Sequence, residues 1–389
     1  VGYAIRTMRR TLPVRRIAVA AVVAANFLLD ATTCATEPPA TPSNHLAGRI
    51  FDYVVQPGDY LIKIGARFGM AASLIAESNN IPYDAILVPG RSLRLDNRHI
   101  VPQQMTRGIL INIPQRMFFY FDAGTLSLHY PVGLGRPDWP TPVGDFTVRS
   151  LQVDKVWNVP KSIQEEMLRK RKAVSSCVPP GPENPLGKHW IGLSISGIGI
   201  HSTIAPASVF HFQSHGCIRL HADDAAAIFP LISVGTPGRL IYEPVLLTRL
   251  DDGRIFVEVH RDVYNRRPDP RRTLEREAHI KSIADLIDWE KAGEAIRRKT
   301  GLAVEIGKGA VARRRRGGRY IDVIDADPFI APDRVGRTNS DFNKRPIVRR
   351  CRQSHINRCN QRRLARTCRG VSDIAARHVN KGSRVTHAI

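Results

Sequence analysis

Cysteine is scarce in this sequence: six cysteines are scattered over 389 residues. That number and spacing exclude the dense disulfide framework on which small secreted domains depend. The uncharged apolar run at residues 17–29 has thirteen residues, fewer than the about 20 that a membrane-spanning helix needs. With 43% hydrophobic residues, the chain can nevertheless bury two or three domain cores.

Acidic residues are few beside basic ones, with 35 Asp and Glu against 58 Lys and Arg and a net charge of +23. A field of that sign attracts polyanions such as nucleic acid, anionic lipid or acidic wall polymers. The charge is uneven, because residues 342–389 hold thirteen basic residues and one acidic residue. The body of the chain is therefore only mildly basic.

The N-terminal region has the order of a secretory signal. Four arginines within residues 9–16 precede the apolar run at residues 17–29, and a charged segment followed by an apolar one directs export. We expect residues 1–35 to form this signal and residues 36–50 to form a linker. An uncleaved anchor and a lipid-modified Cys34 are the alternatives.

Residues 51–98 predict a small module with the order strand, helix, helix, strand. Short β-type runs lie at both ends, and apolar residues at helical spacing lie between them. In chain order the four runs are residues 53–55, 60–68, 71–79 and 92–95. Asp59 follows a Pro-Gly turn and is the expected cap of the first helix.

Residues 108–245 predict a mainly β domain. Short β-branched and aromatic runs are broken by Gly and Pro, a pattern typical of a sandwich or a barrel-like fold. The runs are residues 109–113, 117–121, 125–132, 144–150, 190–195 and 240–242. One short helix is expected to begin at Asp223 as its cap and to be disturbed by Pro230.

The C-terminal part divides in two. Residues 246–307 predict a strand and a helical extension, with an amphipathic apolar set in residues 270–300. Residues 308–389 form a basic tail with too few apolar residues to bury a core, and we expect this tail to be disordered.

One segment carries the residues of a nucleophilic site: IHST at residues 200–203 and SHGCIRL at residues 214–220. A Cys thiol is only slightly ionised at neutral pH and needs a base to attack an amide. His201 and His215 are both candidates to deprotonate Cys217. The spacing of His215 does not by itself bring its ring to the sulfur, whereas His201, at the end of a strand folded over the loop, can approach it.

Two further residues fit this chemistry. Gly216 permits a sharp turn that points backbone N–H groups, including that of Cys217, at a developing oxyanion. Arg219 can hold a substrate carboxylate bidentately. Taken alone, a Cys is more often a small buried hydrophobe and a His a structural residue. His211 and His215 are four residues apart, but no helix and no CxxC pair accompany them, so no metal site is predicted.

The module at residues 51–98 resembles a LysM domain, which binds N-acetylglucosamine chains of peptidoglycan and chitin. The matching stretches are YVVQPGDYL at residues 53–61, Asn79-Asn80 and LVPG at residues 87–90. The resemblance implies a sugar groove whose residues include Gly58, Asp59, Tyr60, Asn80 and Ile81. Such modules usually have Thr or Ser where Tyr60 stands, and this departure affects the sugar contacts.

The block around Cys217 closely resembles the active-site signature of the L,D-transpeptidase catalytic domain family, in its periplasmic Gram-negative branch. Other marks of the family are PVGLG at residues 131–135, TPVGDF at 141–146, PPGPENPLG at 179–187 and GTP at 235–237. The resemblance implies an enzyme that forms a thioacyl intermediate on Cys217 from the tetrapeptide stems of peptidoglycan.

The resemblance also assigns the site residues. The catalytic residues are Cys217, His201, His215, Ser202 and Gly216, and the substrate-binding residues are Arg219, Ser214 and Thr203. His201 would deprotonate Cys217, while the Ser202 backbone or side chain orients its ring. The family usually has Gly where Ser202 stands. Residues 153–184 lie between strands and form either a lid over the site or, at residues 162–172, a solvated surface helix.

The implied partners are peptidoglycan tetrapeptide stems and glycan strands, with no metal, no organic cofactor and no nucleic acid. The acyl acceptor is the amine of a second stem, a lysine of a wall-attached lipoprotein, or water. Together with the export signal, the resemblance predicts a periplasmic enzyme that builds the wall and maintains cell shape. The competing hypothesis is a catalytically inactive protein that binds peptidoglycan through its LysM domain.

Overall fold

The structure is a computed structural model that describes residues 41–42 and 45–309. The predicted signal at residues 1–35 and nearly all of the predicted basic tail lie outside these residues. All of the described residues fall within one compact unit. Within the described part, no helix combines the length and the apolar character that crossing a bilayer requires.

The N-terminal module has the predicted order strand, helix, helix, strand. It consists of β3 (Ile50–Val54), α2 (Leu61–Phe68), α3 (Ala72–Ser78) and β4 (Ser92–Asp96), and β3 pairs with β4 in antiparallel fashion. Its core buries side chains from both helices and from β4, among them Leu61, Ile64, Phe68, Ile75, Leu93 and Leu95. The alternation of buried and exposed residues along β4 places its Leu side chains on the helix-covered face.

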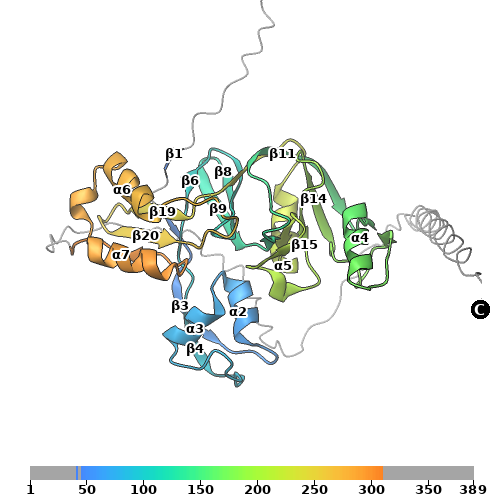
Figure 1. The fold of residues 1–389 in the computed structure, drawn as a ribbon, viewed down its shortest axis with the longest axis horizontal. Coiled ribbons are helices and arrows are strands. Elements are labelled where there is room, and N and C mark those ends of the chain that lie inside the picture. Colours follow the sequence, from blue (N-terminus) through green and yellow to red (C-terminus); the bar gives the residue numbers. More distant parts are fainter. Residues whose placement is uncertain (1–40, 43–44, 310–389) are drawn as a thin grey trace, which may run out of the picture. The chain divides into compact units, whose positions relative to one another are not determined.

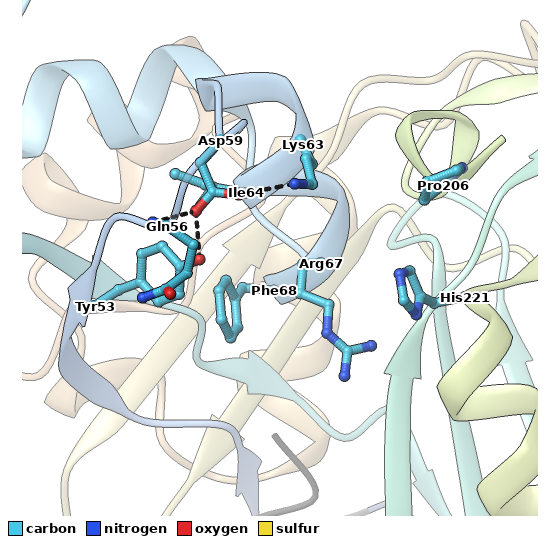
Figure 2. A pocket seen from close by; sticks show the side chains of 9 residues that line it. All are labelled: Tyr53, Gln56, Asp59, Lys63, Ile64, Arg67, Phe68, Pro206 and His221. Atoms are coloured by element: carbon cyan, nitrogen blue, oxygen red, sulfur yellow. Dashed lines mark hydrogen bonds and ion pairs between the residues drawn. The ribbon is translucent and has the colours of Figure 1, made fainter. Parts of the chain in front are cut away.

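Asp59 does not cap α2, and that prediction is wrong. The helix begins after Tyr60, which makes no side-chain capping hydrogen bond. The Asp59 carboxylate instead accepts hydrogen bonds from the Tyr53 hydroxyl at 2.5 Å and the Gln56 N–H at 2.8 Å, and it pairs with Lys63 at 3.0 Å (Figure 2). Asp59 therefore connects the turn before the helix to Tyr53 on β3.

The central domain is built on one eight-stranded sheet, and the mainly β prediction is confirmed. Every predicted run overlaps a strand of this sheet. The strands are β7 (Gly108–Asn112), β8 (Met117–Asp122), β9 (Thr125–Pro131), β11 (Gly144–Val153), β14 (His189–Leu193), β15 (Gly199–Ser202), β17 (Ile218–Leu220) and β18 (Pro237–Ile241). Their order is β17-β15-β14-β11-β18-β7-β8-β9. Only β15 with β17 and β18 with β7 are parallel neighbours.

The short helix predicted near Asp223 is α5 (Ala222–Ile228), which packs against β15 (Figure 1). Its N-cap is His221, whose ring accepts a hydrogen bond from the Asp223 N–H at 3.4 Å. Asp223 lies in the first turn, so its predicted role as the cap is wrong. The predicted disturbance at Pro230 is confirmed, because the chain changes to a 3-10 turn over Phe229–Leu231.

The C-terminal part holds more strand than predicted. The strands β19 (Val245–Arg249), β20 (Ile255–Val259) and β21 (Val304–Glu305) form an antiparallel sheet. The predicted helical extension consists of two helices after β20, namely α6 (Pro270–Ile280) and α7 (Trp289–Arg298). Ser282, with φ of 53°, turns the chain between them, which the apolar periodicity could not reveal.

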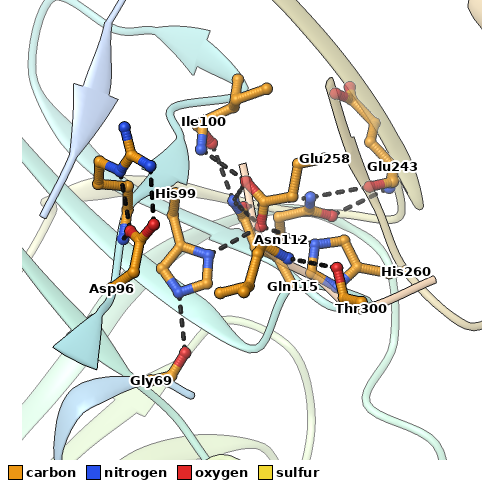
Figure 3. Close-up of polar contacts among 12 residues, drawn as sticks. Gly69, Asp96, His99, Ile100, Asn112, Gln115, Glu243, Glu258, His260 and Thr300 are labelled. Atoms are coloured by element: carbon orange, nitrogen blue, oxygen red, sulfur yellow. Dashed lines mark hydrogen bonds and ion pairs between the residues drawn. The ribbon is translucent and has the colours of Figure 1, made fainter. Parts of the chain in front are cut away.

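A buried carboxylate joins this sheet to the segment before β7. Glu258 is fully buried and accepts hydrogen bonds from His99 Nδ1 at 2.7 Å, His260 Nε2 at 2.8 Å and the Ile100 N–H at 2.6 Å (Figure 3). The other ring nitrogen of His99 lies 2.9 Å from the Gly69 carbonyl. Burial alone raises the pKa of Glu258, but the charge of His99 and the hydrogen bonds from both histidines outweigh burial and lower the pKa to about 2.

Candidate active site

The parallel pairing of β15 with β17 assembles the site. His201 on β15 lies opposite Arg219 on β17, and Ile200 lies opposite Ile218. Cys217 directly precedes β17, so the same register places it level with Gly199. Side chains two residues apart on a strand share one face of the sheet. His201 and Cys217 are therefore diagonal neighbours on that face.

Cys217 is a free, partly exposed thiol. Its Sγ lies 3.6 Å from the Gly197 carbonyl oxygen. Burial raises the pKa of the thiol, while a hydrogen bond from the Gly199 backbone and the positive charge of Arg219 oppose that rise. A Cβ on Gly199 would lie 2.4 Å from the Trp190 ring, so only glycine fits between Trp190 and this stretch of strand.

His201 is 5% exposed. Its Nδ1 donates to the Ser202 carbonyl at 2.6 Å, and its ring stacks on Trp190 with centroids 6.0 Å apart. Because Nδ1 carries the proton, Nε2 keeps its lone pair. Burial lowers the pKa of His201 to about 4; the hydrogen bond to Ser202 opposes this shift and the charge of Arg219 adds to it. The imidazole is therefore neutral at neutral pH and able to accept a proton.

Ser202 contacts the His201 ring through its backbone carbonyl and not through its side chain. The Ser202 hydroxyl accepts a hydrogen bond from the His189 N–H at 3.0 Å and donates to the Leu186 carbonyl at 3.3 Å. It thus holds the segment that leads into β14. Of the two ways of orienting the ring that the family resemblance implied, the structure contains the backbone one.

The loop before Cys217 is held by hydrogen bonds from neighbouring segments. Gly216 has φ of 99°, a conformation that favours glycine. Its carbonyl accepts from the Thr141 hydroxyl at 2.9 Å, and the Thr141 hydroxyl accepts from the Gly135 N–H. The Ser214 hydroxyl donates to the Cys217 carbonyl at 2.5 Å. Thr141, which lies in the TPVGDF stretch, thereby fixes the turn before Cys217.

The predicted substrate-binding residues differ in their availability. The hydroxyl of Ser214 is used within the loop, and that of Thr203 accepts a hydrogen bond from the Ala205 N–H at 3.1 Å. Arg219 is half-buried, and its backbone pairs with Gly133 through two hydrogen bonds of 2.8 Å. Among the described residues no carboxylate pairs with its guanidinium, which leaves this group available to an anionic substrate group.

His215 has a partner that local sequence patterns did not reveal. Its Nε2 lies 2.5 Å from the carboxylate of Glu166, which belongs to α4 (Lys161–Arg169) in the segment considered as a lid. Glu166 also pairs with Arg136 at 2.9 Å and Lys170 at 2.5 Å. Hydrogen bonds from Arg136, Lys170 and His215 hold the pKa of Glu166 well below its usual range. No short motif links residues 49 positions apart.

The predicted glycan-binding residues flank the two helices of the N-terminal module. Gly58, with φ of 79°, and Tyr60, which is 47% exposed, lie in the turn before α2. Asn80, exposed with φ of 51°, and the partly buried Ile81 follow α3. Asp59 is occupied by its internal partners.

A pocket beside this turn also reaches Pro206 and His221 (Figure 2). Among its polar groups, Asp59 pairs with Lys63 at 3.0 Å and Arg67 pairs with Asp224 at 2.8 Å. None of Cys217, His201 or Arg219 lines the pocket. In the part of the chain that the structure describes, no group of three or more His, Cys, Asp or Glu residues is placed to hold a metal ion.

Two family models match the chain. Residues 106–245 match the L,D-transpeptidase catalytic domain, and residues 53–96 match the LysM domain. These matches cover the sheet that carries Cys217 and the N-terminal module respectively.

Several curated relatives are similar along most of their length. "Probable L,D-transpeptidase ErfK/SrfK" of Escherichia coli (strain K12) is 27% identical over 314 residues, which is 76% of this chain and 98% of that protein. The protein of the same name in Salmonella typhimurium is 29% identical, over 64% of this chain and 83% of its own length. "Probable L,D-transpeptidase YcfS" of E. coli is 30% identical, over 57% of this chain and 71% of its own length.

Proposed function

The chain belongs to the L,D-transpeptidase family and is an L,D-transpeptidase, and we propose that Cys217 is its nucleophile and His201 its general base. The observation that carries the assignment is the β15–β17 pairing, which puts the two side chains on one face as diagonal neighbours. The Nδ1 hydrogen bond to Ser202 supports it further, because Nε2 is left as the acceptor. A cysteine activated by an oriented histidine is an established arrangement for acyl transfer.

In the first half-reaction, Cys217 Sγ attacks the carbonyl carbon of the third residue of a tetrapeptide stem. His201 Nε2 takes the thiol proton and delivers it to the amine of the departing D-alanine, leaving a thioester. Burial favours the neutral thiol and the neutral imidazole, so proton transfer accompanies attack instead of preceding it. Backbone N–H groups at Gly216 and Cys217, with His215 beside them, stabilise the oxyanion.

In the second half-reaction, an amine attacks the thioester carbonyl carbon and His201 takes a proton from its nitrogen as the new amide bond forms. The bond to Cys217 Sγ breaks, and His201 returns the proton to the sulfur. The donor of this amine is a second stem or a lysine of a wall-attached lipoprotein; water in its place would give a carboxypeptidase. Arg219 positions the stem by holding a carboxylate, a role supported by its half-buried guanidinium, which has no carboxylate partner among the described residues.

We further propose that the LysM module binds glycan strands through the turns before α2 and after α3, and so keeps the enzyme on its polymeric substrate. Tyr60 and Asn80 are the exposed members of the predicted groove. The chain would act in the periplasm, exported by the signal at residues 1–35, in building the wall and maintaining cell shape.

The first test is the intact mass of the full chain after incubation with a carbapenem, a β-lactam that acylates nucleophiles of this kind. Wild type is expected to gain one drug mass, and Cys217→Ala to gain none. Folded wild-type protein without an adduct would contradict the assignment and favour the inactive peptidoglycan-binding alternative. Release of D-alanine from a tetrapeptide stem, measured on the same two proteins, checks the natural reaction.

A further inference from the structure

Glu166 is a buried carboxylate on a short surface helix. Helix α4 lies between β12 (Trp157–Asn158) and β13 (Cys177–Val178), a small hairpin outside the main sheet. The Glu166 side chain is only 9% exposed. Its neighbour Glu165 is exposed. The burial of one of two adjacent acids indicates a specific contact, because an ionised carboxylate stays in water unless partners hold it.

The partners of Glu166 divide between its two oxygens. Oε1 accepts from Arg136 at 2.9 Å and from Lys170 at 2.5 Å, and Oε2 is used for His215 Nε2 at 2.5 Å. An ionised carboxylate can only accept, so Nε2 of His215 must carry a proton. Trp139 meets the His215 ring edge-on at 4.3 Å between centroids, and Arg136 lies over Trp139 at 5.2 Å. The ring is thus held on two sides.

His215 stands directly before the Gly216–Cys217 turn. Gly216 has the wide conformational freedom of glycine, with φ of 99°, so this turn keeps one shape only if its flanks are fixed. Thr141 holds one flank through the Gly216 carbonyl. Glu166 holds the other flank through His215.

We propose that Glu166 is a positioning residue for acyl transfer: through His215 it holds the Gly216–Cys217 turn in its reactive shape and ties helix α4 to the nucleophile. This inference rests on the proposed role of Cys217. Residues 153–184 are therefore connected to the site through the carboxylate–imidazole hydrogen bond of Glu166. The charged groups that surround His215 are Glu166 and, behind that carboxylate, Arg136 and Lys170.

The test is a double-mutant cycle on the full chain, read as the second-order rate constant for carbapenem acylation of Cys217. Glu166→Gln is expected to lower this constant about 10- to 100-fold, because small misplacements of a reacting group have effects of that size. His215→Gln should lower it by a similar factor. In the His215→Gln background, Glu166→Gln should have no further effect, since residues that act as one unit are not additive. Glu165→Gln is the matched control and should remain within about 2-fold of wild type.

The outcomes separate the two proposals. Wild-type protein that forms no adduct would overturn the role of Cys217 and this inference with it. Adduct formation by wild type and Glu166→Gln at equal rates would overturn the inference alone. Losses that multiply in the double mutant would also overturn it, because Glu166 would then act independently of His215. If Glu166→Gln lowers the thermal unfolding temperature, the comparison within the His215→Gln background gives the decision: a loss of acylation rate on adding Glu166→Gln there would overturn the inference.

Discussion

His201 and Arg219 lie opposite each other on neighbouring parallel strands, so a base and a permanent cation share one half-buried face of the sheet. Burial lowers the pKa of His201 to about 4, and the charge of Arg219 acts in the same direction. The same charge opposes the burial-driven rise in the pKa of Cys217. Arg219 thus helps keep His201 neutral and also favours the thiolate form of Cys217.

The pH dependence of acylation should reflect this environment. Because the pKa of His201 is lowered from 6.5 to about 4, the ring stays a competent base as the pH falls and is protonated only near pH 4. The rate constant for carbapenem acylation should therefore keep its pH 7 behaviour through pH 6 and lose its His-dependent part near pH 4. The measurement is that constant between pH 3.5 and about 8, with circular dichroism as the folding control. An acid limb centred near 6.5 would contradict the assignment.

Replacing His201 with Gln should reduce acylation by about 100-fold or more, the usual contribution of a general base. The glutamine can still donate to the Ser202 carbonyl but provides no basic nitrogen. Intact mass should show slow or no adduct at pH 7, while iodoacetamide still alkylates Cys217 in the folded variant. Unchanged acylation in this variant would move the role of base to another group.

Ser202→Gly tests which part of Ser202 orients the ring. The side chain holds His189 N–H and the Leu186 carbonyl, whereas the contact with His201 Nδ1 is made by the backbone carbonyl. We expect acylation within about 2-fold of wild type and a loss of about 1–2 kcal/mol in the free energy of unfolding, from two hydrogen bonds and a more flexible residue. A 10-fold slower acylation in a protein of unchanged stability would indicate that the hydroxyl takes part in orienting the ring.

Arg219→Gln should weaken substrate binding and should also lower the rate at which the Cys217 thiol reacts. Losing a charge-assisted contact with a carboxylate should raise KM for a tetrapeptide stem by about 10-fold or more. Because the charge of Arg219 opposes the raised pKa of Cys217, alkylation by neutral iodoacetamide should also slow at pH 7. Arg249→Gln, at an exposed position on β19, should change neither quantity. A variant with normal KM would remove Arg219 from stem recognition.

Local patterns predicted the elements well and their long-range partners poorly. The β-branched runs overlap the strands of the central sheet, and the spacing before residue 98 predicted both helices of the LysM module. The cap predictions for Asp59 and Asp223 were wrong. Asp59 accepts a hydrogen bond from Tyr53 on the preceding strand instead, and α5 begins two residues earlier than a cap at Asp223 would require.

In the candidate site, too, the residues of the local motif were predicted and a long-range partner was not. The motif contains Cys217, His201 and Arg219 because His201 and Arg219 lie on two adjacent parallel strands and Cys217 directly precedes the second of them. Glu166 was missed because its contact with His215 depends on how residues 153–184, distant from the motif in the sequence, fold against it. Acidic residues at helical spacing from basic ones are common on exposed helices, and only the burial of Glu166 separates it from Glu165.

Glu258→Gln should lower the free energy of unfolding without changing the rate of acylation. The fully buried carboxylate of Glu258 accepts hydrogen bonds from His99 and His260, and an amide in its place removes the negative charge that both rings contact, a change that costs about 3–5 kcal/mol in comparable buried pairs. The pKa of Glu258 is lowered from 4.5 to about 2, so its contribution to the free energy of unfolding is present above pH 4.5 and is lost as the pH falls towards 2.

Urea unfolding of wild type and Glu258→Gln at pH 7 and at about pH 3 measures this contribution. The difference in the free energy of unfolding between the two proteins should be large at pH 7 and smaller at pH 3. Glu305→Gln, exposed on β21 of the same sheet, is the control and should change stability by less than about 0.5 kcal/mol. An equal gap at both pH values would mean that packing, and not the charge of Glu258, holds the histidines in place.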